Sequence, residues 1–200
     1  LENLRKVLRA SLEFGIKILT IYAFSTENWS RPRAEVRALL LLLSRAFAQE
    51  TEELDRNGVR IRQLGRTEGF NQSLLNNIRK AEELTRDNDR LLLNVAFDYG
   101  GRAEIVNAVR QIVRQGIPAE AIDEETIQRH LWTGDMPDPD LIIRTGGDMR
   151  LSNFLIWQAA YAELYVTPTF WPSFGKDELY KALLDYQNRQ RRFGGLYVGP

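Results

Sequence analysis

Apolar positions along the chain follow two spacings: short runs typical of buried strands, and stripes three to four residues apart typical of helices. Glycine residues near the ends of several stripes indicate where those helices stop. The runs predict strands over residues 17–24, 59–64, 91–97 and 141–144. The stripes predict helices over residues 4–14, 34–57, 71–87, 102–115, 124–131, 153–162 and 176–192.

Strands that alternate with helices in this way indicate parallel βαβ units. We therefore expect an α/β protein with an open, mostly parallel central sheet flanked by helices. With 200 residues and no long linker, the chain is expected to form a single domain over residues 1–200. Ligands of such sheets bind beyond the carboxyl ends of the strands. Ser25, Asp98 and Arg144 lie at or just after predicted strand ends, so we expect them to share one edge.

Charge and composition narrow the classes of function. The 27 Lys and Arg residues balance 27 Asp and Glu residues, so no overall field attracts nucleic acid. Cysteine is absent and His130 is the only histidine, which excludes thiolate metal sites and disfavours a Ser-His-Asp triad. The lack of cysteine fits a reducing compartment. No run approaches the roughly 20 apolar residues that span a bilayer, so we expect a cytoplasmic protein.

Two polar segments that follow predicted strands carry arginine, serine and amide side chains. They are residues 25–32 (STENWSRP) and residues 144–154 (RTGGDMRLSNF). Guanidinium groups and outward-pointing backbone N–H groups at a strand-to-helix turn bind oxyanions. Two such turns in a small domain predict two phosphate-bearing ligands side by side. Structural interpretations stay open, because Asn28 could cap the next helix and Gly146 with Gly147 could form an ordinary turn.

Acidic residues offer two candidate metal sites. Glu163 lies in an apolar, aromatic stretch, where a carboxylate either pairs with an arginine or binds a hard cation such as Mg²⁺. Both interpretations of Glu163 stay open at this point. Asp135, Asp138 and Asp140 form a second cluster, but prolines between them break the helix that would align them. A solvated loop is the favoured interpretation of that cluster.

Longer motifs resemble the cis-prenyltransferases, the family typified by undecaprenyl diphosphate synthase. The match begins with residues 23–32 (AFSTENWSRP) and continues in the same order and spacing along the chain. The further matching segments are residues 99–102 (YGGR), 143–147 (IRTGG), 150–154 (RLSNF), 157–158 (WQ), 161–165 (YAELY), 171–174 (WPSF) and 191–195 (RRFGG).

The resemblance implies a reaction and a set of site residues. Isopentenyl diphosphate would condense with an allylic diphosphate, expected to be farnesyl diphosphate, to give a Z-polyprenyl diphosphate with release of diphosphate. Mg²⁺ is the implied cofactor, with Glu163 among its ligands, from the partner subunit of a homodimer. Asn28 is the implied catalytic residue in proton removal, and because an amide is a poor base we expect it to position or relay the proton. The implied substrate-binding residues are Ser25, Thr26, Glu27, Trp29, Arg31, Arg144, Arg150, Leu151, Ser152, Arg192 and Gly194.

One departure from the family pattern bears on activity. The family begins with a strand and a Met-Asp-Gly-Asn-Gly-Arg-Trp loop whose aspartate binds Mg²⁺, and no segment of the chain matches it. Without that segment we expect little catalysis, and a truncated chain is the more economical explanation. A noncatalytic subunit of a heteromeric enzyme, or a synthase of short or irregular terpenoid diphosphates on the same fold, remains an alternative. The apolar product implies peripheral membrane contact.

Overall fold

The computed structural model describes residues 2–190, which divide into two compact units. Residues 11–137 form the larger unit, and residues 2–10 together with 138–190 form the smaller one. Helix α1 (Glu2–Glu13) contributes to both units, because the division falls after Ala10. The organisation of the chain as a single domain stays a prediction.

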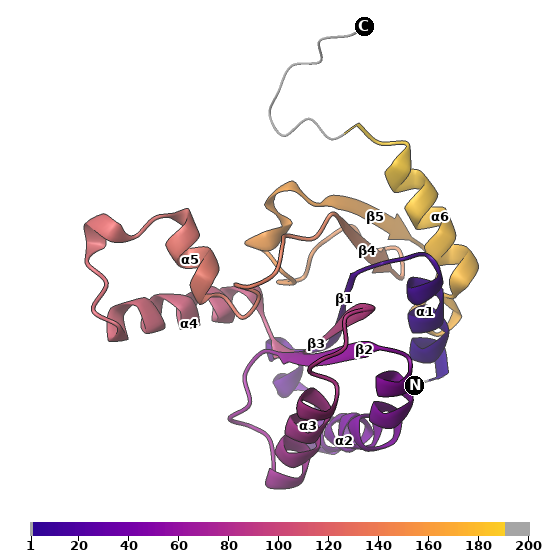
Figure 1. Ribbon diagram of the computed structural model, residues 1–200, viewed down its shortest axis with the longest axis horizontal. Helices are drawn as coiled ribbons and strands as arrows, with labels where there is room; N and C mark the ends of the chain where they lie inside the picture. The colour runs from indigo at the N-terminus through magenta and orange to yellow at the C-terminus, as the bar shows by residue number, and fades with distance from the viewer. Residues whose placement is uncertain (1, 191–200) are drawn as a thin grey trace, which may run out of the picture. The chain divides into compact units, whose positions relative to one another are not determined.

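A three-stranded parallel sheet is the centre of the larger unit (Figure 1). Its strands are β1 (Ile18–Ser25), β3 (Leu91–Tyr99) and β2 (Val59–Leu64), in the spatial order β1-β3-β2. Both pairings are parallel, so the carboxyl ends of β1, β2 and β3 lie at the same edge. The register of β1 against β3 shifts between Tyr22 and Phe24, which makes an irregularity just before the first polar segment.

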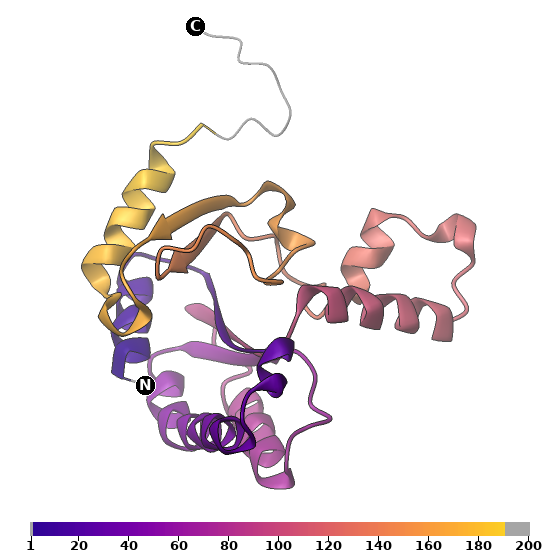
Figure 2. The ribbon, with the colours of Figure 1, turned by 180° about the vertical axis from the view of Figure 1, so that it is seen from behind.

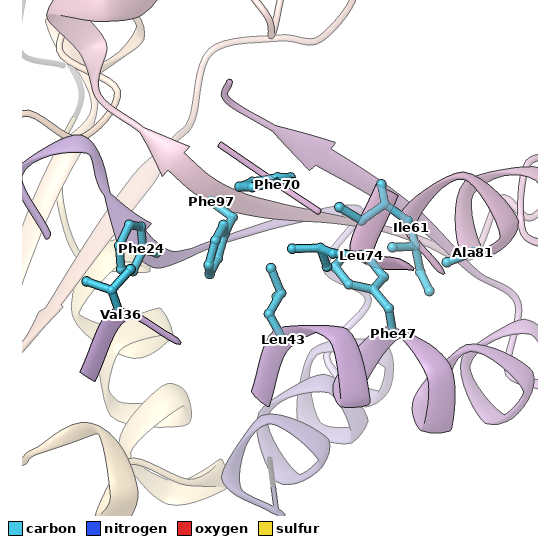
Figure 3. Packing of buried hydrophobic residues seen from close by; sticks show 10 residues of the cluster. Phe24, Val36, Leu43, Phe47, Ile61, Phe70, Leu74, Ala81 and Phe97 are labelled. Carbon is cyan, nitrogen blue, oxygen red and sulfur yellow. The ribbon is translucent and has the colours of Figure 1, made fainter. Parts of the chain in front are cut away.

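Helices α2 (Arg33–Arg56) and α3 (Gln72–Leu84) pack on each other and against β2. Asn71 caps α3 by accepting the Leu74 N–H at 2.9 Å, and Gly58 follows the C-terminal turn of α2 with a positive φ of 73°. Between these helices and the sheet lies one apolar cluster, shown in Figure 3. It contains Phe24, Val36, Leu43, Phe47, Ile61, Phe70, Leu74, Ile78, Ala81 and Phe97.

Three aromatic rings fill the part of this cluster nearest the ends of β1 and β3. Phe24 stacks on Phe97 with ring centroids 4.8 Å apart, and Phe70 meets Phe97 edge to face at 5.5 Å (Figure 3). Burial of each ring stabilises the fold by about 2–3 kcal/mol. The sequence segments that follow β1 and β3 therefore begin from firmly packed positions.

The remaining part of the larger unit is a pair of helices that extends from the sheet, visible in Figure 2. It consists of α4 (Gly101–Arg114), the short 3₁₀ helix η2 (Ala119–Ala121) and α5 (Glu124–His130). The carboxylate of Glu104, which is 1% exposed, accepts the Trp132 N–H at 2.9 Å and the hydroxyl of Tyr99. This buried carboxylate fixes the segment after α5 to the end of β3.

The smaller unit contains a two-stranded parallel sheet of β4 (Leu141–Thr145) and β5 (Glu163–Thr167). Helix α6 (Lys176–Gln187) packs against β5, and the 3₁₀ helices η3 (Gln158–Tyr161) and η4 (Trp171–Ser173) complete the connections. The α/β class and the parallel pairing agree with the sequence prediction.

One predicted helix is wrong, and one strand was missed. Residues 153–162 form turns and only the short helix η3, because Asn153 and Leu155 have positive φ values of 64° and 46° that an α-helix excludes. The missed strand is β5, which follows directly after η3. Its sequence, ELYVT, does carry the aromatic and β-branched residues that favour strands. The helix predicted to run to residue 192 ends earlier, at Gln187, and residues 188–190 are not helical.

Candidate active site

The first polar segment forms a tight turn between β1 and α2. Residues Thr26–Ser30 make the 3₁₀ helix η1, with Ser25 as its first flanking residue. The Ser25 backbone N–H donates to Oδ1 of Asn28 at 2.9 Å. Because a backbone N–H can only donate, this bond fixes which end of the Asn28 amide is oxygen. Asn28 therefore does not cap the next helix, α2, whose N-cap is Pro32; its oxygen instead accepts the N–H of Ser25 at the start of η1. This leaves the Asn28 NH₂ group as the end that can donate to a ligand.

Trp29 is held from two sides within the same turn. Its ring meets Phe24 edge to face, with centroids 5.5 Å apart, and its indole Nε1–H donates to Oδ1 of Asp98 at 2.7 Å. The indole thus packs on the aromatic cluster of the larger unit and reaches the end of β3. This contact joins the strand ends of Ser25 and Asp98, which were expected to lie together. The third expected member of this edge, Arg144, lies in β4 of the separate two-stranded sheet, so the prediction of one sheet edge for all three is wrong.

The charged residues of the turn are already engaged in local contacts. Arg31 forms an ion pair with Glu35 one helical turn on, with 2.7 Å between Nη1 and Oε1. The Ser30 hydroxyl donates to the Glu27 carbonyl at 2.7 Å. Arg31 is half exposed, so its guanidinium can exchange Glu35 for an anionic ligand at little cost, since exposed pairs contribute about 0–1 kcal/mol. Thr26 is half-buried and Glu27 is exposed.

The second polar segment follows β4 and has an unusual backbone. Gly146 and Gly147 have positive φ values of 90° and 82°, and Ser152 has a φ of 50°. The Gly146 N–H donates to the carbonyl of Thr169 at 3.0 Å, and the Gly147 N–H donates to that of Thr167 at 2.9 Å. The prediction that backbone N–H groups point outward at this turn is therefore wrong for both glycines. Neither of these two N–H groups is directed at an anion in this structure.

Three of the predicted binding side chains do gather in the loop after β4. Arg144 donates to the Ser152 hydroxyl at 3.1 Å and lies 3.4 Å from the Asp148 carboxylate. Arg150 contacts the same Asp148 oxygen at 2.5 Å. Two guanidinium groups thus converge on one carboxylate, the arrangement that a phosphate group would also satisfy. Leu151 lies half-buried between Arg150 and Ser152.

Strain in this loop is consistent with a binding role. Residues other than glycine rarely adopt positive φ, and each instance costs of order 1–3 kcal/mol. Ser152, Asn153 and Leu155 all do so within four residues. Such strain concentrates at ligand-binding sites, where the surrounding structure holds side chains in place before the ligand arrives.

Glu163 begins β5 and pairs with an arginine. Its Oε2 lies 2.7 Å from Nη1 of Arg189, whose Nη1 also donates to the Leu164 carbonyl at 3.1 Å. The hydrogen bond to Glu163, and to a smaller extent the one to Asp185, raises the pKa of the Arg189 guanidinium above its ordinary value. Of the two interpretations of Glu163, arginine pairing is present in the structure.

The other interpretation of Glu163 is that it binds magnesium. Within residues 2–190, no group of three or more His, Cys, Asp or Glu side chains is arranged to hold a metal ion. Mg²⁺ usually takes only one or two carboxylates and completes its shell with substrate phosphates and water. A single carboxylate such as Glu163 is compatible with that coordination, provided that the ligand supplies phosphate oxygens.

Within one chain, Glu163 and the arginine cluster lie at different levels of the β4–β5 sheet. Glu163 is in register with Leu141, whereas Arg144 is in register with Val166. Three residues of strand correspond to about 10 Å. The described residues therefore do not bring Glu163 together with Arg144. The predicted residues Arg192 and Gly194 lie outside the described residues.

Comparisons with known proteins identify the class to which this fold and these side chains belong. A sequence model of undecaprenyl diphosphate synthase, a prenyltransferase, matches residues 1–194. An isoprenyl transferase of Heliobacterium mobile is 49% identical over 98% of this chain and 77% of its own length. One from Thermotoga maritima is 48% identical over 99% of this chain and 86% of its own length.

Two solved structures are similar as well. Lavandulyl diphosphate synthase from Lavandula x intermedia, in complex with dimethylallyl diphosphate, has a TM-score of 0.92 and 35% identity, covering 96% of this chain and 85% of that one. A probable undecaprenyl diphosphate synthase from Campylobacter jejuni has a TM-score of 0.87 and 35% identity, covering 96% and 90%. The chain belongs to the undecaprenyl diphosphate synthase family of prenyltransferases. It is accordingly a transferase of the isoprenyl type.

Two polar residues of the site were not selected from the sequence. Asp148 lies between Arg144 and Arg150, and Arg66 pairs with Asp98, which also receives the Trp29 indole N–H. Asp98 itself was expected at the edge of the sheet, because it directly follows a buried strand in the sequence. Arg66 carried no such signal, because it stands in a polar loop among other charged residues.

Proposed function

We propose that this protein elongates a prenyl chain in the cis configuration, joining isopentenyl diphosphate to an allylic diphosphate such as farnesyl diphosphate. The convergence of Arg144, Arg150 and the Ser152 hydroxyl carries the proposal. Two guanidinium groups and a hydroxyl suit a diphosphate better than they suit a carboxylate or a neutral ligand. These three side chains would hold isopentenyl diphosphate, with Asp148 giving way to the incoming phosphate.

The proposed reaction breaks and forms one bond at the allylic carbon. Its C–O bond breaks as diphosphate leaves with the electron pair, and the double bond of isopentenyl diphosphate attacks the same carbon to form a C–C bond. A proton then leaves C2 of the former isopentenyl unit, which produces the new double bond. Mg²⁺, when bound, would stabilise the charge that develops on the leaving diphosphate. Positive donors of the protein serve the same purpose.

Asn28 would take part through its NH₂ group. The oxygen of this amide already accepts the Ser25 N–H, so the group offers two N–H donors to a ligand. We therefore assign Asn28 to orienting a diphosphate near the carbon that loses its proton, and not to capturing the proton. Ser25, Thr26, Glu27, Trp29 and Arg31 would line the reaction centre around it.

Glu163 is the described residue that would hold Mg²⁺, together with diphosphate oxygens. Its separation from Arg144 within one chain fits the expectation that Glu163 serves the site of a partner subunit in a homodimer. No helix within residues 2–190 is both long and apolar enough to cross a bilayer. We propose that the protein acts in the cytoplasm, with peripheral membrane contact when it releases its apolar product.

An assay with labelled isopentenyl diphosphate tests this function. The chain of 200 residues and a form extended at its N-terminus by the family's whole upstream segment, with its first strand and its Met-Asp-Gly-Asn-Gly-Arg-Trp loop, are each incubated with farnesyl diphosphate and Mg²⁺. Extracted products are then sized by chromatography. We expect polyprenyl diphosphates several isopentenyl units longer than the primer from the extended form. No incorporation by either folded form would contradict the proposal and favour a noncatalytic subunit.

The second candidate is a synthase of a short or irregular terpenoid diphosphate. The structural similarity to lavandulyl diphosphate synthase bound to dimethylallyl diphosphate favours it. The same assay separates the two candidates when dimethylallyl diphosphate is supplied alone and together with isopentenyl diphosphate. A ten-carbon branched product from dimethylallyl diphosphate alone would replace chain elongation with this second function.

A further inference from the structure

Asp98 is a buried carboxylate at the carboxyl end of β3. It is 3% exposed and has a positive φ of 49°. Trp29 Nε1 donates to its Oδ1 at 2.7 Å, and Arg66 donates to both oxygens, from Nη2 to Oδ1 at 2.9 Å and from Nε to Oδ2 at 3.2 Å. A carboxylate taken out of water in this way needs its charge and its hydrogen bonds matched. Arg66 supplies the charge and Trp29 an additional donor.

Arg66 contacts Asp98 through its backbone as well as through its side chain. The Arg66 N–H donates to the Asp98 carbonyl at 3.1 Å. Gly65, just before it, has a φ of 122°, and a Cβ there would lie 2.3 Å from the carbonyl oxygen of Phe97. Only glycine allows this approach, so the loop after β2 is built to bring Arg66 against the end of β3.

Trp29 transmits this arrangement to the turn that carries Asn28. The indole lies against Phe24 on one side, and a Cβ added at Gly69 would lie 2.8 Å from the indole ring. Phe24 and Gly69 thus limit the space around the ring, and the bond to Asp98 orients its N–H. Trp29 is adjacent in sequence to Asn28 within the five residues of η1. A displacement of the indole would therefore act on the same five-residue turn that holds the Asn28 amide.

We propose that Asp98 and Arg66 are positioning residues that set the conformation of residues 25–30 through Trp29. They act on isoprenyl transfer by holding Asn28 in place, without contacting the substrate. The inference rests on the proposed function for its effect on rate, but the contacts themselves can be tested without catalysis. Asp98 provides a fixed acceptor for the indole, and Arg66, bonded to both of its oxygens, keeps that acceptor in place.

The structural part is tested by NMR of the ligand-free protein labelled with ¹⁵N at the tryptophan indole. The Trp29 signal is assigned from its loss in Trp29→Phe. We expect Asp98→Ala to shift this signal upfield and to speed exchange of its proton with water. Asp98→Asn keeps an oxygen acceptor and tolerates positive φ, so it should restore most of the shift. Because this readout needs no turnover, it distinguishes failure of the positioning role from failure of the proposed function.

The kinetic part uses the form that is active in the elongation assay. We expect Asp98→Ala to lower kcat about 10- to 100-fold with less than 3-fold change in KM for isopentenyl diphosphate, since that substrate is assigned to Arg144 and Arg150. Asp98→Asn should recover to within about 5-fold of wild type. Trp29→Phe combined with Asp98→Ala should be no slower than the slower single variant, because both remove the same contact.

Thr85→Val is the matched control. The buried Thr85 hydroxyl accepts the Ile61 N–H at 2.9 Å, so its loss destabilises the same unit by about 1–3 kcal/mol without touching the turn. Its kcat and Trp29 signal should equal those of wild type at a temperature where both are folded. An unchanged Trp29 signal or an unchanged kcat in Asp98→Ala would overturn the proposal. A kcat loss in Thr85→Val as large as that in Asp98→Ala would also overturn it, because a general loss of stability would then explain both.

Discussion

The Ser25 backbone N–H binds the Asn28 side-chain oxygen at 2.9 Å, and this single contact decides what Asn28 can do. The oxygen accepts a hydrogen bond within the turn, so the NH₂ group is the end of the amide that could donate to a ligand. Under the proposed function, we therefore assign the Asn28 amide to donating to a diphosphate, where the family resemblance implied that it positions or relays a proton. This distinction leads to a direct test of the amide itself.

Replacing Asn28 by aspartate separates the two roles. Asn28→Asp keeps an oxygen for the Ser25 N–H, so the turn should be retained, but it turns the donor end into a negative acceptor. We expect kcat to fall about 100- to 1,000-fold, the usual loss when a donor to a developing anion is removed. Steady-state kinetics check this. Aspartate is the better base, so activity equal to or above that of wild type would show that Asn28 accepts the proton.

Arg150 and Asp148 should have opposite effects on affinity for isopentenyl diphosphate. Arg150→Ala removes a charge-assisted bond worth about 1.5–3 kcal/mol and should raise KM for isopentenyl diphosphate about 10- to 150-fold. Asp148→Asn releases both arginines from a competing carboxylate and should lower this KM. The allylic KM should change less than 3-fold in both. A rise in KM for isopentenyl diphosphate in Asp148→Asn would mean that Asp148 is needed to place the arginines.

Gly65 should be intolerant of a side chain, whereas Gly116 should accept one. A Cβ at Gly65 would meet the Phe97 carbonyl at 2.3 Å, whereas a Cβ at Gly116 meets nothing within 4 Å. Both residues have positive φ, so both alanine variants pay about 1–2 kcal/mol for backbone conformation. Gly65→Ala should lose roughly 3 kcal/mol or more in total, because the strand ends must separate. Urea unfolding measures the difference, and equal losses at the two sites would contradict it.

Glu178 should contribute to stability only above acidic pH. The hydrogen bond from Lys181, followed by that from Thr169, lowers the pKa of Glu178 below its ordinary value of 4.5. A carboxylate with a lowered pKa in the folded state stabilises the protein above its unfolded pKa, and that stabilisation is lost as pH falls through the folded pKa. The free energy of unfolding of wild type should therefore exceed that of Glu178→Gln at pH 7, with the difference shrinking below about pH 4.5. A difference that grows towards acid pH would contradict this assignment.

Much of the fold was accessible from the sequence because its elements are strongly patterned. Strand β2 was predicted at its observed bounds, Val59–Leu64, from alternating apolar and polar residues. Helix α2 was predicted to within a residue at each end, since Pro32 precedes it and Gly58 follows it. The loop after β4 was not, because an apolar stretch there resembles a helix while positive φ values at Asn153 and Leu155 prevent one.

The sequence predicted which residues form the site, but it did not predict their hydrogen-bond partners. Motifs pointed to Arg144, Arg150 and Ser152, and the structure brings these three together. The sequence could not reveal that the N–H groups of Gly146 and Gly147 donate to carbonyl groups at the end of β5 and just after it. Such contacts join residues more than 15 positions apart. The pairing of Arg66 with Asp98 is hidden for the same reason.

The geometry of the double bond formed by the enzyme tests the central claim most directly. Farnesyl diphosphate and ¹³C-labelled isopentenyl diphosphate are incubated with the active form and Mg²⁺, and the new double bonds are assigned by ¹³C NMR. Cis-prenyl elongation predicts Z geometry at every added unit. The double bonds of the farnesyl primer should stay unchanged. New double bonds of E geometry would contradict it. So would the absence of any new C–C bond between the labelled isopentenyl unit and the primer.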